Sequence, residues 1–284
     1  MKKRRVLVSG ATGQQGGAVV QALLKDGHDV VGITRNVASP KAKKLTEKGV
    51  EMIAVDFTDM ESLVEIMKKV DTVFCMTTPF EKGMEHEIEQ GKTMANAAEK
   101  AGVGHFIFNS VGDANQPTGI PHFDSKFEVE KHLKSLNMPY TIVGPAYFMD
   151  NLFFPFILDD LKNGLLKIAM PADRKLQQIA VEDIGKFVGI VVNERESLFG
   201  KRINISGDEL TGEDAARVLT GILGKEIRYE GFSPDYMRAQ SEDMAIMYDW
   251  FNDKGYTADL ESLKKYGFMS FENWASKQDW SAIL

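Results

Sequence analysis

Three regularly spaced glycines lie between two apolar segments near the start of the chain: Gly10, Gly13 and Gly16. Glycine permits a sharp turn with positive φ, lets the backbone approach a ligand closely, and lets a helix settle onto the preceding strand. The first amide groups of that helix are unpaired, and together with the helix dipole they attract an anion such as a pyrophosphate. The spacing therefore predicts the phosphate-binding turn of a dinucleotide fold.

A basic residue after the second apolar segment indicates which dinucleotide is bound. At this place an acidic side chain accepts a hydrogen bond from the 2′-hydroxyl of NAD, whereas an arginine suits the 2′-phosphate of NADP. Arg35 follows Gly10 by 35 − 10 = 25 residues, close to the expected interval of about twenty. We therefore expect NADP(H) as the cofactor. The alternative is a helix entry without a ligand, followed by a solvated basic loop.

Alternating strands and helices must hold this turn in place, and the hydrophobic pattern predicts them. Short apolar runs alternate with segments of helical periodicity, which favours a parallel sheet with helices on both faces. The expected strands are residues 6–9, 29–34, 51–55, 72–76, 105–109 and 140–143, and the expected helices are 18–24, 60–69, 85–101 and 125–136.

The alternation loosens after about Asn151, where aromatic residues become frequent. Helices are expected at 152–164, 181–193 and 210–224, the last capped by Thr211, and strands at 165–170, 177–181, 201–207 and 225–232. We therefore predict an α/β chain of two domains. Residues 1–150 form a doubly wound, parallel-sheet NADP(H)-binding Rossmann domain, and residues 151–284 form a smaller substrate or partner lobe interleaved with the sheet.

Composition limits the function classes. A net charge of −7 over 284 residues argues against direct binding of nucleic acid. We find no apolar stretch long enough for a membrane span or a signal peptide, and therefore expect a cytoplasmic protein. Cys75 is expected to be a buried hydrophobe. The acidic segment MEHEIEQ, with Glu85, His86 and Glu87, is interpreted as a solvated helix face, so no metal is expected.

Five segments, in this order, resemble the NmrA-like family of atypical short-chain dehydrogenase/reductases, and most closely its NADPH-sensor group. They are VSGATGQQGGAVVQALL, TRN, HFDSKFEVEKHL, GPAYFMDNLF and VEDIG. The resemblance covers nearly the whole chain. It implies a Rossmann fold with the strand order 3-2-1-4-5-6-7 and a small C-terminal lobe.

The resemblance also implies roles for individual residues of a cofactor site. The phosphate turn would comprise Gly10, Thr12, Gly13, Gln14, Gln15 and Gly16, and the grip on the 2′-phosphate would be Arg35 with Asn36. Beside the adenosine would lie Asp56, Phe57, Thr77, Thr78 and Pro79. On the nicotinamide side would lie Lys126, Phe148 and Asn151, with Lys126 bonded to the ribose.

One position departs from the pattern of active short-chain dehydrogenases. Their tyrosine stands four residues before the lysine, and here 126 − 4 = 122 is His122. An imidazole titrates near neutral pH, but its reach differs from that of a phenol. His122 and Lys126 are therefore the candidate catalytic pair. Ser110 could stand for the family's serine or be an ordinary turn residue, and both interpretations remain open.

Two functions follow from this departure. The first is a regulatory protein that binds NADP(H) and senses its redox state, with a protein partner. The second is an NADPH-dependent reductase of small hydrophobic electrophiles such as quinones, since some members of the family reduce such compounds without the tyrosine. A homodimer is a further option for its assembly.

Overall fold

The computed structural model describes residues 2–283, and the contacts between them divide the chain into two units. Unit 1 contains the chain up to Gln116, together with Pro121–Gly144 and Val181–Ile203. Unit 2 contains Pro117–Ile120, Pro145–Ala180 and the chain from Asn204 onward. The chain thus returns to unit 1 after first leaving it. The division into contact units does not test the predicted domain boundary at residue 150, which stays a prediction.

A seven-stranded sheet forms the centre of unit 1 and confirms the predicted strand order. Its order is β10-β6-β5-β4-β1-β2-β3, and the pairs from β3 to β6 are all parallel. The strands are β1 (Arg5–Val8), β2 (Asp29–Thr34), β3 (Glu51–Ala54), β4 (Thr72–Met76), β5 (Phe106–Asn109), β6 (Tyr140–Pro145) and β10 (Lys201–Ile205). Because β1 lies at the centre and the order reverses beside it, loops after β1 and β4 meet at one edge.

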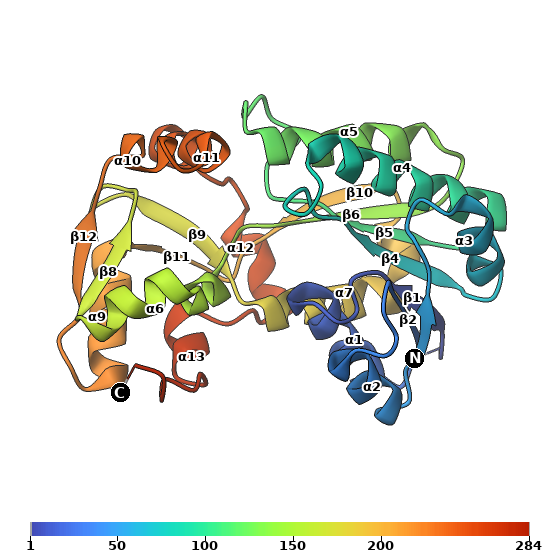
Figure 1. Cartoon of the computed structure of the whole chain (residues 1–284), viewed down its shortest axis with the longest axis horizontal. Coiled ribbons are helices and arrows are strands. Elements are labelled where there is room, and N and C mark those ends of the chain that lie inside the picture. Colours follow the sequence, from blue (N-terminus) through green and yellow to red (C-terminus); the bar gives the residue numbers. More distant parts are fainter. Residues whose placement is uncertain (1, 284) are drawn as a thin grey trace. The chain divides into compact units, whose positions relative to one another are not determined.

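Helices cover both faces of this sheet (Figure 1). One face carries α1 (Gln14–Lys25), α2 (Pro40–Glu47) and α7 (Val181–Asn193), and the short α8 (Arg195–Leu198) follows α7. The other face carries α3 (Met60–Met67), α4 (Met84–Ala101) and α5 (Pro121–Ser135). The doubly wound α/β fold predicted from the sequence is therefore confirmed.

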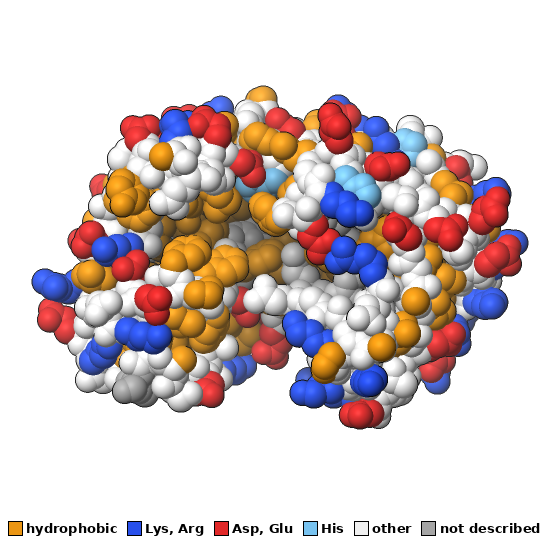
Figure 2. Space-filling view, in the orientation of Figure 1, with side chains coloured by type: hydrophobic (Ala, Val, Ile, Leu, Met, Phe, Trp, Pro, Cys, Tyr) orange, Lys and Arg blue, Asp and Glu red, His pale blue; other side chains and the backbone are white. Residues whose placement is uncertain are grey.

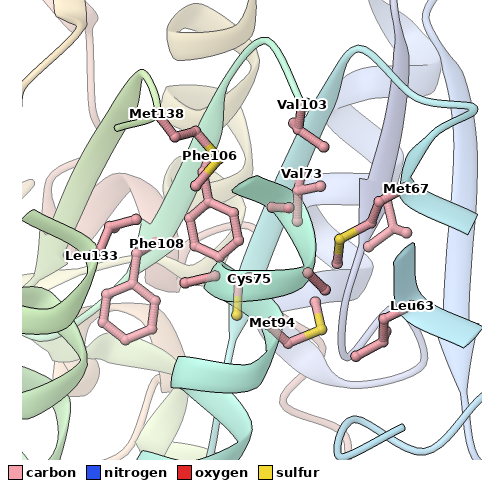
Figure 3. Close-up of a cluster of buried hydrophobic side chains, with 14 of the residues drawn as sticks. Leu63, Met67, Val73, Cys75, Met94, Val103, Phe106, Phe108, Leu133 and Met138 are labelled. Atoms are coloured by element: carbon pink, nitrogen blue, oxygen red, sulfur yellow. The ribbon is translucent and has the colours of Figure 1, made fainter. Parts of the chain in front are cut away.

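The core between the sheet and the second helical layer is apolar and tightly closed. Figure 3 shows Phe106, Phe108 and Cys75 from neighbouring strands pointing toward Met94 and Leu133 of the covering helices. Cys75 has no exposed surface, and burial raises the pKa of its thiol to about 12. The prediction that Cys75 is a buried hydrophobe is confirmed.

Helix α7 packs closely against α1, because a glycine lies at the contact. A Cβ atom on Gly185 would lie 3.0 Å from the backbone nitrogen of Val19 and would also meet the carbonyl group of Ala18. Gly185 belongs to the VEDIG segment. This contact fixes the helix whose first turn follows the glycine-rich loop.

Unit 2 has its own small sheets and its own core. Its strands are β7 (Tyr147–Phe148), β9 (Lys175–Ile179) and β11 (Asp208–Thr211), ordered β11-β9-β7, and the parallel pair β8 (Leu165–Ile168) and β12 (Arg228–Gly231). Its helices are η1 (Met149–Phe153), α6 (Pro155–Lys162), α9 (Gly212–Leu223), α10 (Asp235–Arg238), α11 (Glu242–Asp253), α12 (Leu260–Leu263), η2 (Lys264–Tyr266) and α13 (Phe271–Ala275). Thr211 caps α9 through a capping box with Asp214, as predicted. Buried side chains of α9 and α13, including Leu219 and Trp274, form the core.

No helix within residues 2–283 is long and apolar enough to cross a membrane, and Figure 2 shows acidic and basic side chains interspersed over the face in view.

Helix α5 begins at Pro121, four residues before the predicted start at 125. Proline suits the first turn of a helix because its missing N–H group would have no partner there. The earlier start places His122 on the same helix as Lys126.

Candidate functional site

The turn between β1 and α1 has the geometry of an anion cradle. Gly10 has a φ of +61°, and its carbonyl oxygen accepts a hydrogen bond of 2.8 Å from the N–H of Gly13. Helix α1 begins at Gln14 after the N-cap Gly13, with no side chain capping it and no acidic residue in its first turn. Its first amide groups therefore face outward without a side-chain acceptor, which suits a diphosphate.

Gly16 closes this turn because the chain passes directly behind it. A Cβ atom there would lie 2.8 Å from the carbonyl oxygen of Ser9 and would collide with the carbonyl group of Gly10. Ser9 joins β1 to β4, since its hydroxyl donates to the carbonyl oxygen of Met76 (2.9 Å) and accepts from the N–H of Met76 (2.8 Å). The turn is thus fixed to two neighbouring strands.

A pocket in unit 1 lies beyond the ends of β1 to β4 and brings together many of the predicted residues. Its lining includes these predicted site residues: Gly10, Thr12, Arg35, Asp56, Phe57, Thr77 and Thr78. It also includes Ile33, Thr34, Met76, Glu81, Lys82 and Gln90, which the sequence did not single out. Because residues far apart in sequence converge beside the glycine turn, the pocket can receive the nucleoside end of a dinucleotide.

Asp56 lies at the rim of this pocket with a fixed carboxylate. Its Oδ1 atom accepts hydrogen bonds from the N–H (2.9 Å) and the hydroxyl (2.7 Å) of Thr58. These bonds lower the pKa of Asp56, so the carboxylate is ionised at neutral pH. An ionised, oriented carboxylate can accept hydrogen bonds from an amino group or a ribose.

Arg35 reaches the pocket but already has a partner. Its Nη1 and Nη2 atoms donate to the two carboxylate oxygens of Glu81, at 2.7 and 2.9 Å. These bonds raise the pKa of Arg35, which stays positively charged. Glu81 lies in the loop between β4 and α4. No sequence pattern indicates this pairing, because the two residues are 46 positions apart.

Lys126 is held at the ends of the same strands by a buried carboxylate. Its ammonium group donates to Glu87 Oε1 (2.7 Å) and to the carbonyl oxygen of Thr77 (3.0 Å). Glu87 also accepts from the hydroxyls of Thr77 (3.0 Å) and Ser125 (2.5 Å), and it has no exposed surface. A lysine has three N–H donors, so one remains for a ligand.

The interpretation of MEHEIEQ as a solvated acidic face is wrong for Glu87. Helix α4 buries Glu87, Gly91, Met94, Ala95 and Ala98, which lie on one stripe at helical spacing. The sequence therefore did contain a signal: an acidic residue stands in line with the apolar residues that face the sheet. Burying a carboxylate is costly unless hydrogen-bond donors surround it. Lys126 is the charged donor to Glu87.

His122 lies one turn before Lys126 on α5, with its ring against two phenylalanines. The centroid of its ring is 4.9 Å from that of Phe123 and 5.9 Å from that of Phe80. His122 is 8% exposed, whereas Phe80 is 74% exposed. The imidazole is therefore largely shielded from solvent, one helical turn from Lys126.

Ser110 points to a second buried carboxylate. Its hydroxyl donates to Glu130 Oε1 (2.6 Å), and Glu130 also accepts from Arg202 Nε (3.0 Å). Because this network joins β5, α5 and β10, it gives Ser110 a structural task. Of the two interpretations left open by the sequence, the structural one has this observation in its favour.

The remaining predicted residues are not among those that line this pocket. Gln15 accepts a hydrogen bond from Asn109; Asn36 accepts one from the N–H of Ala38 (2.9 Å). Gly13, Gln14 and Gly16 form the turn and the first residues of α1, and Pro79 follows Thr78 in the loop after β4. Phe148 in β7 and Asn151 in η1 belong to unit 2 and are both half-buried.

Comparison with known proteins assigns the fold and the family. The family model for the NmrA-like family matches residues 2–276. An NmrA-like family domain-containing protein of Dictyostelium discoideum is 29% identical over 268 residues, which are 89% of this chain and 88% of that protein. The chain belongs to the NmrA-like family.

Two solved structures share the fold over almost the entire chain. NmrA, a negative transcriptional regulator in complex with NADP, superposes with a TM-score of 0.83 at 19% identity and covers 99% of each chain. An NADPH-dependent quinone oxidoreductase from Escherichia coli, complexed with NADPH, gives a TM-score of 0.81 at 24% identity, covering 95% of this chain and 98% of that one. The same fold thus occurs in a transcriptional regulator and in an oxidoreductase.

Proposed function

We propose that this chain binds NADP(H) in unit 1 and acts as a regulatory protein whose conformation or choice of partner reports the redox state of the cofactor. One observation carries the proposal: the glycine turn at the uncapped start of α1 opens beside a pocket that Arg35 enters. The turn would hold the diphosphate, Arg35 the 2′-phosphate, and Lys126 the nicotinamide ribose. The two similar structures solved with NADP or NADPH support the choice of cofactor.

The preference for regulation over turnover rests on position 122. NADPH supplies a hydride when bound, and reduction of a carbonyl needs a proton donor placed beside the accepting oxygen. A well-placed general acid is worth about 10²- to 10⁴-fold in rate. Here that position holds an imidazole packed against Phe80 and Phe123, so the usual proton donor is replaced by a group of different reach.

A reductase of small hydrophobic electrophiles is the second candidate. Lys126 is retained and firmly held by Glu87, and the quinone oxidoreductase shares the fold. Hydride transfer to a conjugated acceptor such as a quinone needs little help from an acid, because the electron pair moves onto an oxygen that solvent can protonate. This chemistry would not require a phenol at position 122.

NADPH consumption over a panel of quinones and enones separates the two functions. For a sensor we expect calorimetry to show that NADPH binds. The absorbance of the reduced nicotinamide should then fall no faster than in a control without protein. Oxidation at about one turnover per second or faster, within the usual range of enzymes, would replace the sensor by the reductase.

Arg35→Ala is expected to weaken NADPH binding about tenfold or more, because each hydrogen bond to a charged group is worth about 1.5–3 kcal/mol. NADH has no 2′-phosphate, so its affinity should change little. Calorimetry with both cofactors measures the difference, and Arg217→Ala, an exposed arginine of α9, is the control. Equal losses for NADPH and NADH would contradict the role given to Arg35.

His122→Ala is expected to leave NADPH affinity within a few-fold of the wild type, because His122 is not among the residues that line the pocket and a sensor needs no proton transfer from it. The matched control is His132→Ala, ten residues further along α5. If the wild type reduces quinones and the variant loses about 10²-fold or more of the turnover, His122 is an acid and the protein is an enzyme.

A further inference from the structure

The guanidinium group predicted to bind the 2′-phosphate is held by a carboxylate of the neighbouring loop. Arg35 and Glu81 form two parallel hydrogen bonds of 2.7 and 2.9 Å between Nη1, Nη2 and the two carboxylate oxygens. Both residues line the pocket in unit 1. Glu81 lies in the loop that follows β4 and carries the predicted ribose contacts Thr77 and Thr78.

A phosphate and this carboxylate would compete for the same donors. The guanidinium fork binds carboxylate and phosphate in the same bidentate way, so it cannot satisfy both in that geometry. A phosphate that reached Arg35 would also meet the negative charge of Glu81. A ribose 2′-hydroxyl does not compete for the guanidinium group, because it is neutral and the Arg35–Glu81 pair can stay intact beside it.

The pair is also open to exchange with solvent. The side chain of Arg35 is 64% exposed and that of Glu81 is 51% exposed. Exposed ion pairs are weak and screened by salt, so a dianionic phosphate can displace the carboxylate. The pairing therefore reduces the affinity for a phosphorylated ribose without blocking it.

We propose that Glu81 is a specificity-determining residue that competes with the ribose 2′-phosphate for Arg35 and lowers the preference of this chain for NADP(H) over NAD(H). The proposal rests on the proposed function, since it concerns the same cofactor site. In the protein without cofactor, Arg35 is paired with Glu81. A cofactor with a 2′-phosphate must break this ion pair to bind Arg35, whereas a cofactor without one need not.

The direct test is Glu81→Gln, with calorimetric dissociation constants for NADPH and NADH at low salt. Glutamine keeps the size of the side chain and removes its charge. We expect NADPH to bind about fivefold to tenfold more tightly, from the lost competition and the lost repulsion. We expect NADH to stay within about twofold, and the gain for NADPH to shrink as salt is added. Glu85→Gln removes an equal charge from an exposed position four residues further on, and it should leave the affinity for both cofactors unchanged.

A second background shows whether the effect passes through Arg35. In Arg35→Ala, the Glu81→Gln change should no longer improve NADPH binding. An equal gain for NADPH and NADH, the same gain without Arg35, or no gain in the wild-type background would overturn the role of Glu81. If wild-type protein binds NADPH and Arg35→Ala weakens it, while Glu81→Gln has no effect, only this inference fails. If wild-type protein binds neither cofactor, the proposed function fails first.

Discussion

Gly16→Ala should destabilise unit 1 and weaken NADPH binding, although alanine is the better helix former. The new methyl group would lie 2.8 Å from the carbonyl oxygen of Ser9 and would overlap the carbonyl group of Gly10. Backbone atoms cannot turn aside as a flexible side chain does, so α1 must shift away from β1. We expect a loss of about 2 kcal/mol in the free energy of unfolding, typical of overpacking. Urea unfolding followed by circular dichroism measures it.

The same shift should be visible in cofactor binding. In the proposed NADP(H) site, moving the turn would remove at least one backbone amide from the diphosphate. One hydrogen bond to a charged group is worth about 1.5–3 kcal/mol, or tenfold and more in affinity. Gly17→Ala is a closely matched control, since its Cβ atom would lie 3.6 Å from the carbonyl oxygen of Ala11, an ordinary contact. That variant should be as stable as the wild type or up to about 1 kcal/mol more stable. Equal behaviour of the two variants would show that close packing at Gly16 is unimportant.

Glu87→Gln is expected to lower the free energy of unfolding by about 3 kcal/mol, because it breaks a buried ion pair from one side. Three donors converge on the carboxylate, from Thr77, Ser125 and Lys126. An amide has a single acceptor oxygen, and its own N–H groups would face one of these donors. The ammonium group of Lys126, which is 13% exposed, would be left with the carbonyl oxygen of Thr77.

Glu85→Gln, on the exposed side of the same helix, provides the control and should stay within about 0.5 kcal/mol of the wild type. A second measurement separates stability from site geometry: Glu87→Gln should also weaken NADPH binding, because Lys126 loses the partner that orients it. A variant as stable as Glu85→Gln, with unchanged NADPH affinity, would show that Glu87 neither stabilises the fold nor positions Lys126.

Gly16 and Glu87 both belong to unit 1, but they differ in how well the sequence predicts their roles. Gly16 belongs to a spacing that already predicted a tight turn, since glycine at such a position has few structural alternatives. Glu87 was misinterpreted, because its acidic neighbours in MEHEIEQ suggested a solvated face. Its place on the buried stripe of α4 with Gly91 and Met94 would have corrected this.

Hydrophobic patterning along the chain predicted the class of fold and most of the strands of the large sheet, but it did not predict α2 or β11. The predicted bounds of β2, β4 and α7 are those of the structure, because hydrophobic periodicity is a property of neighbouring residues. The strand order of the sheet followed from the family resemblance and is also observed. Tertiary structure alone decided that α7 packs on α1 through Gly185 and that Glu81 holds Arg35. A sequence shows that a residue is charged or small, but its partner is chosen by the folded chain, which brings distant positions together and sets how far water reaches them.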